Sequence, residues 1–568
     1  MRFSRRDFLQ YAAVTAAATA PLHRFGGGIT RVAAQQRLTQ DDLLAFDAKG
    51  TLTLLHLTDI HAQLKPVYFR PPDTNIGVGD YAGIPPHLVG EAFLEHFGIA
   101  PGSALAYAHT MVDYVDMARA YGRMGGIDRI ATLVKAIRAE RGDANVLLLD
   151  GGDTWQGSYT CLQTDAQDMV DCFKLLKPDA MVGHWEFTLG TERLLELVEQ
   201  MDYPFLASNI VDTDWEEPVF ESTSVHDVGG ARVAVIGQAM PYTPIANPRW
   251  MFPEWSFGLR TEVLAANVDQ ARADGADVVV LLSHDGFDVD RKMASVVPGI
   301  DVILTGHTHD AIPEAIRIGE TLLLASGSHG KFLGRVDLEV KNGKVTDYAT
   351  TLIPVFADVI EPDAEMTAKV TEVRAPYEAE LGRVIGRTDS LLFRRGNFNG
   401  TWDDLICEGL MTERDAELSL SPGFRWGTTL LPDSDITVED LFTQTAMTYP
   451  SVYRLEFTGV QIKEILEDVC DNLFNPDPFF QQGGDMVRVG GMSYACDPDA
   501  AIGARISDLT FLVSGEPIEP SRAYVVAGWA SVNEDVEGPP VYELMEKWFG
   551  SQKTVSAAEG DTVDVIGR

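Results

Sequence analysis

Basic residues are scarce in this chain, which carries 45 lysines and arginines against 84 aspartates and glutamates, for a formal net charge of −39. A surface with that excess of negative charge repels the phosphates of DNA and RNA, so we expect no nucleic-acid partner. It also keeps free anions at a distance unless metal ions reverse the field locally.

Cysteines are also few, and none forms a Cys-x-x-Cys pair, which leaves a zinc knuckle or a thioredoxin-type site without support. Their odd number leaves at least one thiol unpaired in a monomer. A Cys470–Cys496 disulfide and buried free thiols are both open. The five are Cys161, Cys172, Cys407, Cys470 and Cys496.

Long apolar runs are missing beyond the N-terminus, so we expect no membrane span after removal of the leader. The leader itself places Arg5-Arg6 and Phe8-Leu9 before an alanine-rich run from Tyr11 to Ala20. This combination predicts a twin-arginine export signal within residues 1–34, with cleavage after Ala20 or Ala34. The mature protein is then expected in the periplasm; the alternative is an ordinary basic amphipathic start.

A chain of 568 residues is too long for one core and predicts at least two domains. Short β-rich apolar runs alternate with helical patterns, which predicts an α/β layered sheet. The expected strands are 52–57, 146–149, 231–237, 278–282 and 302–304, and the expected helices are 127–138, 191–200 and 261–274.

The boundaries follow from composition. We expect a catalytic domain over 45–358, with an insertion of about 66–122 that forms a wall or lid. A linker helix over 359–385 leads to a second α/β domain over 386–550, with short helices at 439–441 and 462–468. The last residues, 551–568, are small and polar and are expected to be disordered.

Seven potential metal ligands directly follow short apolar runs, where ligands gather in such sheets. One tetrahedral ion needs about four ligands, so seven suit two ions that share a bridging carboxylate such as Asp153. The Asp-x-His and His-x-His spacings place two ligands on one side of an extended backbone. His56, inside a strand, is assigned to the core. The seven are Asp59, His61, Asp153, His184, His284, His307 and His309.

The motifs DIH, GGDTWQGS, GHWEF, SHDG and TGHTHD together resemble the 5′-nucleotidase family of calcineurin-like metallophosphoesterases. The segments 125–132, 447–468 and 489–494 extend the resemblance to roughly residues 50–540. It implies a layered metallophosphoesterase domain followed by a 5′-nucleotidase-type substrate domain. It also implies one ion held by Asp59, His61, Asp153 and His309. The other would be held by Asp153, His184, His284 and His307, with a hydroxide between the ions as the nucleophile.

One departure from the family pattern concerns substrate. Family members read Gly-Asn-His-Glu where this chain reads Gly183-His184-Trp185-Glu186. His184 can replace the asparagine ligand, whereas Trp185 replaces a histidine that assists the leaving group. A sulfur anion needs less assistance than an alkoxide, because its conjugate acid is much stronger. The alternative is that another residue supplies the proton and Trp185 only packs.

The variant motif and the leader resemble the two-manganese thiosulfohydrolase branch of the family. That resemblance implies a periplasmic enzyme of the sulfur-oxidation (Sox) system. It would release sulfate from a cysteine-bound thiosulfonate on the SoxYZ carrier. The alternatives are a periplasmic nucleotidase or related phosphoesterase, and a non-catalytic metal-binding protein.

The second domain also departs from the nucleotidase pattern. Arg425, in the segment 421–426 that corresponds to the nucleotidase substrate segment, is expected to bind the sulfonate bidentately. Phe479 and Phe480 lie near the place of the aromatic pair that holds a nucleobase, and they are equally well explained as core residues. A carrier arm would require a narrow channel between the domains.

Overall fold

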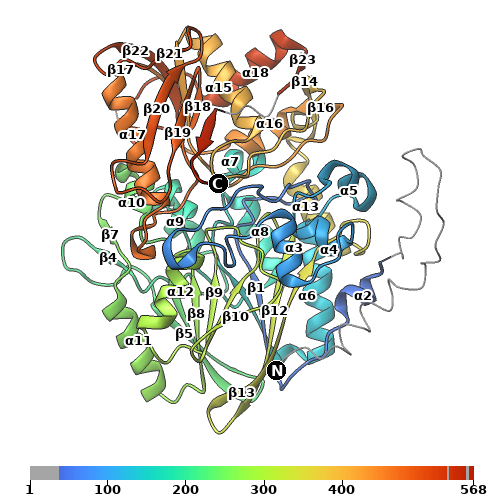
Figure 1. Ribbon diagram of the computed structural model, residues 1–568. Coiled ribbons are helices and arrows are strands. Elements are labelled where there is room, and N and C mark those ends of the chain that lie inside the picture. Colours follow the sequence, from blue (N-terminus) through green and yellow to red (C-terminus); the bar gives the residue numbers. More distant parts are fainter. Residues whose placement is uncertain (1–37, 534–535, 558–561) are drawn as a thin grey trace, which may run out of the picture.

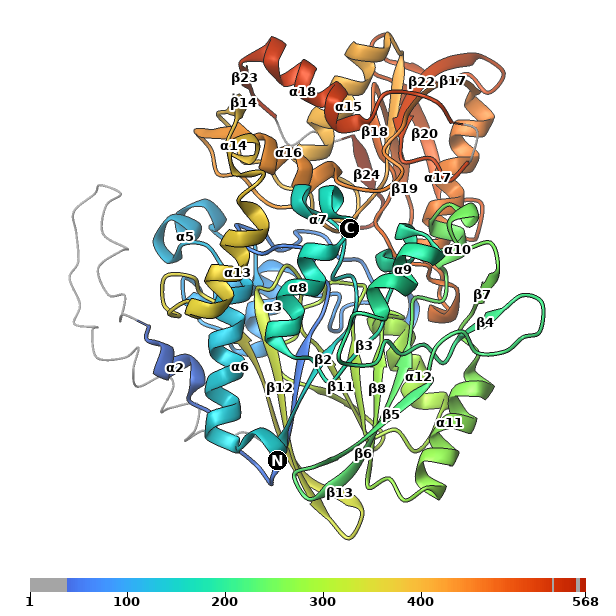
Figure 2. The ribbon, with the colours of Figure 1, turned by 180° about the vertical axis from the view of Figure 1, so that it is seen from behind.

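The computed structural model describes residues 38–533, 536–557 and 562–568, so the predicted signal lies outside the described residues. The chain forms an N-terminal part, lower in Figure 1, and a C-terminal part above it. Both parts mix helices and strands, as the sequence predicts. Their arrangement matters because the ligand-bearing strand ends of the lower part point toward the upper one (Figures 1 and 2).

Two stacked sheets form the core of the N-terminal part. Parallel pairings join β1 to β2 and β2 to β3 in the first sheet, and β6 to β8 and β8 to β9 in the second. The first sheet runs β13-β12-β1-β2-β3, with bounds Lys344–Pro354, Phe332–Lys341, Leu52–Leu57, Val146–Asp150 and Ala180–Met181. The second runs β10-β11-β9-β8-β6-β5, with bounds Ile316–Ile318, Thr321–Ala325, Val302–Thr305, Val278–Ser283, Ala231–Gln238 and Thr223–Val228.

Side chains that alternate between the two faces of each strand divide the core into layers. Leu54 of β1 and Val280 of β8 pack between the sheets. Their neighbours Leu55 and Leu281 face outward onto helices. Because successive side chains point to opposite faces, strands buried on both sides require continuous apolar runs. The covering helices are α6 (Ile127–Arg141) and α8 (Gln167–Leu176) on the first sheet and α11 (Thr261–Ala273) and α12 (Phe287–Val296) on the second.

The predicted strands and helices of this part are confirmed, with ends that shift by no more than a few residues. Residues 66–122, expected as an insertion, contain helices of their own beside the first sheet (Figure 1). These helices are α3 (Gly90–Phe97), α4 (Ala104–His109) and α5 (Tyr114–Tyr121).

The linker was expected as one helix, which is wrong. The structure has two helices, α13 (Ala364–Arg374) and α14 (Glu378–Leu381). Pro376 lies between them, and proline lacks the N–H that a helix interior requires.

The C-terminal part packs four main helices around small sheets. One of these sheets has four strands in the order β17-β22-β15-β18, with bounds Val452–Thr458, Ala523–Trp529, Leu418–Ser421 and Arg488–Gly490. The helices are α15 (Thr401–Arg414), α16 (Val438–Thr445), α17 (Gly459–Leu473) and α18 (Val541–Gln552). The two short helices expected here are therefore the longer α16 and α17.

The expectation of a disordered tail over 551–568 is wrong for its described residues. β23 (Thr554–Val555) pairs with β14 (Val384–Thr388), and β24 (Val563–Val565) pairs with β19 (Met492–Cys496). Main-chain hydrogen bonds make these pairings, and they do not depend on apolar composition.

Candidate metal centre

The seven predicted ligands meet where the two sheets end. Asp59 and His61 follow β1, Asp153 follows β2, and His184 follows β3. The second sheet contributes His284 after β8, and His307 and His309 after β9. All seven leave the carboxyl ends of parallel strands, the usual ligand side of such sheets.

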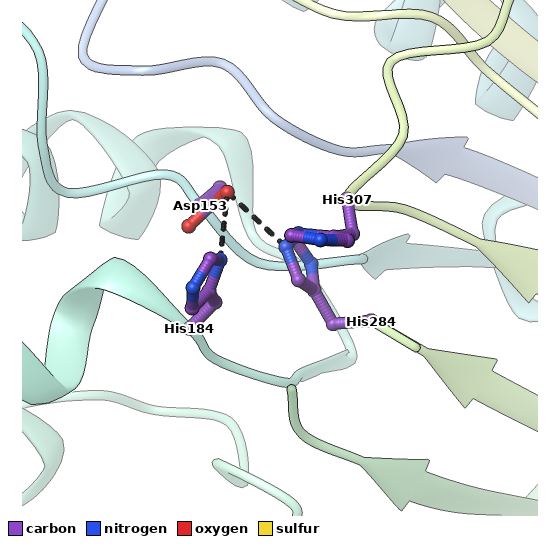
Figure 3. Close-up of side chains that lie close together, drawn as sticks. All are labelled: Asp153, His184, His284 and His307. Atoms are coloured by element: carbon purple, nitrogen blue, oxygen red, sulfur yellow. Dashed lines mark hydrogen bonds and ion pairs between the residues drawn. The ribbon is translucent and has the colours of Figure 1, made fainter. Parts of the chain in front are cut away.

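The ligand atoms fall into two groups of four that share Asp153. One group is Asp153, His184, His284 and His307 (Figure 3); the other is Asp59, His61, Asp153 and His309. Within each group the atoms lie within 4.8 Å of one another. Asp153 Oδ2 is 3.2 Å from His184 Nδ1 and 3.1 Å from His284 Nε2. The second group brings His309 Nε2 within 3.2 Å of Asp59 Oδ1. These are the two sets that the family resemblance implies.

The backbone at the ligands is not extended, contrary to the expectation from the Asp-x-His spacing. Asp59 has φ 53°, His61 49° and Asp153 55°, and His307 and His309 have 71° and 58°. Such left-handed conformations cost of order 1–3 kcal/mol each and persist where the surroundings impose them. Tight turns after the strands therefore aim these side chains.

Glycines beside the ligands allow the loops to approach one another. A Cβ on Gly152, whose φ is 86°, would lie 2.8 Å from Val182 O and 3.2 Å from His284 Nδ1. A Cβ on Gly306 would collide with Thr58 Oγ1. The contacts of these Cβ atoms with Val182 O and Thr58 Oγ1 are shorter than real Cβ atoms make. A side chain at either position would therefore force the loops apart.

Hydrogen bonds fix the orientation of the imidazoles and carboxylates. His284 Nδ1 lies 2.5 Å from Gly151 O, which assigns its proton to Nδ1 and leaves Nε2 for a metal. His61 Nδ1 contacts Gln156 Oε1 at 3.1 Å, and Thr58 Oγ1 donates to Asp59 Oδ2 at 2.5 Å. Outer partners of this kind orient metal ligands.

The chemistry of the site fits two divalent ions. His184 Nε2, both nitrogens of His307, and His309 Nδ1 are buried without a hydrogen-bond partner among the described residues. Burial, with His184, His284 and Arg425, holds the pKa of His307 well below its ordinary value. Burial alone would raise the pKa of Asp153, yet His184 and His284 hold this pKa well below its usual range. Metal binding requires neutral imidazoles and an ionised carboxylate, which His307 and Asp153 already offer. His284 differs because, against the effect of burial, Asp153 and Asp59 raise its pKa to about 10, so this imidazole must release a proton when an ion binds.

The Trp185 ring packs among aromatic residues, and its main chain contacts a predicted metal ligand. Its N–H donates to Asp153 Oδ1 at 2.9 Å. Its ring stacks on Tyr449 at 6.1 Å and meets the edge of Phe424 at 5.3 Å, with only 6% of the residue exposed. The ring therefore belongs to an aromatic contact with the C-terminal part.

A cavity opens beside His307 between the two parts of the chain. Arg395 and Arg425 line it from the C-terminal part, and Asp285 and Asp310 line it from the N-terminal part. Residues 75–77 and 86–87 of the insertion complete the wall. Arg425, which the sequence predicts to bind substrate, thus lines this cavity, and so does Arg395, which the sequence did not indicate.

The other candidates lie outside the cluster. His56 is buried within β1, contacts Ser326 Oγ at 2.8 Å, and has its pKa lowered to about 3 by burial and by His284. Phe479 packs on Lys292 Nζ of α12 at 4.1 Å, whereas Phe480 is 62% exposed, so the two rings have different surroundings. All five cysteines are free and buried, although Cys470 Sγ and Cys496 Sγ are 3.4 Å apart.

Glu186 belongs to the site although the sequence did not predict a function for it. Its carboxylate accepts hydrogen bonds from the main-chain N–H groups of Thr154 and His184, at 2.7 and 2.8 Å. It therefore holds together the loops that carry Asp153 and His184. The signal was its place within the GHWEF motif.

Comparison with known families supports this picture. Residues 384–542 match the 5′-nucleotidase C-terminal domain, and residues 2–21 match the signal sequence of the twin-arginine translocation pathway. No helix within the described ranges is long and apolar enough to cross a membrane.

Individual curated proteins and solved structures show the same resemblance. The chain is 28% identical to the 5′-nucleotidase of Rattus norvegicus over 323 residues, 51% of this chain and 54% of that protein. It thus spans about half the length of the curated relatives that it matches. Among solved structures, the sulfate thiohydrolase SoxB of Thermus thermophilus has a TM-score of 0.89 and 37% identity, covering 92% of this chain and 98% of that one. A 5′-nucleotidase precursor from the same species has a TM-score of 0.72 at 20% identity, covers 91% and 99%, and supports the fold.

Proposed function

Because this chain belongs to the 5′-nucleotidase family, in the group of the sulfate thiohydrolase SoxB, we propose that it is a two-metal thiosulfohydrolase. Its substrate is a thiosulfonate carried on a cysteine of the SoxYZ carrier. Water attacks the sulfonate sulfur, the sulfur–sulfur bond breaks, sulfate is released, and the carrier keeps a persulfide. The product persulfide anion is a good leaving group because its conjugate acid is comparatively strong.

The observation that carries the proposal is the position of Trp185. Its ring is stacked on Tyr449, and an indole has no acidic proton to give to a leaving group. A site that lacks a general acid at this position suits a persulfide leaving group better than a nucleoside alkoxide.

Arg425 is proposed to bind the sulfonate. Its Nη1 is buried without a hydrogen-bond partner among the described residues, and its side chain is 11% exposed beside the cavity that His307 lines. A guanidinium presents parallel N–H groups that match the oxygens of a sulfonate. The walls of the cavity would keep bulk water from the carrier's sulfur.

The two ions are proposed to be Mn²⁺, held by the two ligand groups that share Asp153. Two adjacent divalent ions activate water and stabilise the charge of the attacked group. A mixed carboxylate and imidazole site accepts several metals, and manganese follows from the family relationship. Reconstitution of the metal-free protein with Mn²⁺, Zn²⁺ or Fe²⁺ tests this choice. Full activity with Zn²⁺ and none with Mn²⁺ would overturn it.

The decisive assay compares two substrates under identical metal loading. We expect sulfate release from thiosulfonate-loaded SoxYZ, and none when the carrier cysteine is replaced by serine. Rapid phosphate release from AMP without activity on the carrier would favour the nucleotidase alternative. Fewer than two ions per chain after full loading, with neither activity, would favour a non-catalytic metal-binding protein.

We propose the periplasm as the location of the mature protein, because the leader matches a twin-arginine signal. Replacement of Arg5 and Arg6 by lysine should retain the protein in the cytoplasm of a bacterial host. The matched control is Arg2→Lys, which leaves the arginine pair intact. Unchanged export of the twin-lysine variant would contradict the assignment.

A further inference from the structure

A buried carboxylate in the C-terminal part holds three arginines at the edge of the cavity. Asp485 precedes β18, and its side chain is 0% exposed. Arg395 Nη1 donates to Asp485 Oδ2 at 3.0 Å, and Arg488 Nη2 donates to the same oxygen at 3.4 Å. Arg425 Nε lies 3.5 Å from Oδ1. Three guanidiniums therefore surround this one carboxylate, and one of them, that of Arg488, also lies 3.5 Å from Asp403.

The arginines favour the ionised form of Asp485. Burial alone would raise the pKa of Asp485, yet Arg395, Arg425 and Arg488 hold this pKa below its usual range. The main chain also anchors this residue, because Asp485 N donates to Gly423 O at 2.7 Å. Asp485 is therefore fixed to the segment that carries Arg425.

Arg395 connects the cluster to the metal centre. Its Nη2 donates at 3.1 Å to the carbonyl of Thr308, which stands between the ligands His307 and His309. One guanidinium thus bonds the metal-binding loop on one side and Asp485 on the other. This fork geometry is available to arginine and not to lysine.

We propose that Asp485 is a positioning residue that sets the distance between the substrate-binding Arg425 and the metal ligands. It does so through Arg395 and the Thr308 carbonyl, and its effect on catalysis is exerted through Arg425. The identity of the anion, a carrier-bound sulfonate, rests on the proposed function. The positioning role applies equally to any tetrahedral anion bound between Arg425 and the ions.

Two explanations for Asp485 predict opposite results. If it only offset positive charge, its neutralisation would leave the cavity more positive and tighten anion binding. If it positions Arg425, neutralisation would release the guanidinium and weaken anion binding. Asp485→Asn, which preserves shape, separates them.

Asp403 supplies a matched control. Its side chain is also 0% exposed, and it holds Arg394 at 2.8 Å and Arg488 at 3.5 Å. Neither Asp403 nor Arg394 lines the cavity. Asp403→Asn therefore removes an equally buried charge from the same part of the chain without touching Arg395 or Arg425.

The experiment measures the inhibition constant of sulfate, KM, kcat and bound metal in the metal-loaded full-length protein. For Asp485→Asn we expect KM and the sulfate inhibition constant to rise about tenfold or more, with two ions retained. Asp403→Asn should change both constants by less than about twofold, while lowering Tm as much as Asp485→Asn does. In an Arg425→Lys background, Asp485→Asn should add little, because the two residues act as one unit.

Equal effects of the two aspartate variants, tighter sulfate binding, or full additivity with Arg425→Lys would each overturn the proposal. If Asp485→Asn does not fold, Arg395→Lys makes the same test, since lysine cannot hold Thr308 O and Asp485 together. Absence of sulfate release by the wild type refutes the proposed function and leaves this inference intact. It is then tested by phosphate inhibition and AMP hydrolysis with the same variants.

Discussion

The carboxylate of Glu186 accepts a hydrogen bond from the main-chain N–H of His184 at 2.8 Å, and its other oxygen accepts from Thr154 N at 2.7 Å and Trp155 N at 3.1 Å. Burial and the neighbouring Asp153 raise the pKa of Glu186 above its ordinary value. One side chain thereby fixes the loops that present two metal ligands. The site depends on this residue although it contributes no ligand atom to either group.

Glu186→Gln is expected to weaken metal binding by about 10–100-fold. The amide has one oxygen and turns an NH2 toward a main-chain N–H, so one of the loops loses its anchor. Competition with a chelator measures the affinity. Glu192→Gln, on the exposed face of α9 (Thr191–Val198), is the control, and an unchanged affinity for Glu186→Gln would refute the anchoring role.

His184→Ala is expected to bind one ion instead of two and to lose activity by at least about 100-fold, because its ligand group keeps only three members. Elemental analysis after gel filtration reports the stoichiometry. His226→Ala, on the edge strand β5, should behave as the wild type. Two tightly bound ions in His184→Ala would contradict the ligand assignment.

Trp185→His tests the leaving-group argument. We expect sulfate release to persist and a weak phosphomonoesterase activity to increase, because an imidazole can donate a proton where an indole cannot. The stacking on Tyr449 is lost, so stability should fall by about 2 kcal/mol. Trp185→Phe keeps an aromatic ring and should show the stability of a stacked site without the new activity. A folded Trp185→His protein that is inactive on both substrates would contradict the argument.

Five strands of the two sheets, namely β1, β2, β6, β8 and β9, and the ligand set were predictable because both depend on local sequence. A strand buried on both faces needs an apolar run, and each ligand motif directly follows such a run. The left-handed backbone at Asp59 and His307 was not predictable, because tight turns between packed loops impose it. The strands β23 and β24 are too short for a periodicity to be visible.

The arginine cluster could not be found from the sequence for a different reason. Arg395, Arg425 and Asp485 are 30 to 90 positions apart, and only the fold of the C-terminal part brings them together. Arg425 was identified through its motif, whereas Arg395 and Asp485 stand in no motif that assigns them a partner. Burial of a charged residue, which reveals such partners, is a property of the folded chain.

Lys331 offers a test of stability against pH. Its Nζ is buried and donates to Ala108 O at 3.0 Å and Phe69 O at 3.2 Å, and burial lowers its pKa to about 7. In the unfolded chain a lysine titrates near its ordinary value of about 10.4. Between these two values the unfolded chain holds more protons, so this group makes the free energy of unfolding rise with pH, by up to about 1.4 kcal/mol per unit.

Lys331→Met should remove that contribution, so the difference in unfolding free energy between wild type and variant should grow in favour of the wild type between about pH 7.5 and 9.5. Below about pH 6 Lys331 is protonated in both the folded and the unfolded wild type, and the difference should become constant. Urea unfolding at each pH measures it, with Lys341→Met, whose side chain is 62% exposed, as the control. A difference independent of pH across this range would show that Lys331 is charged in the folded protein, so that the two carbonyls compensate for its burial.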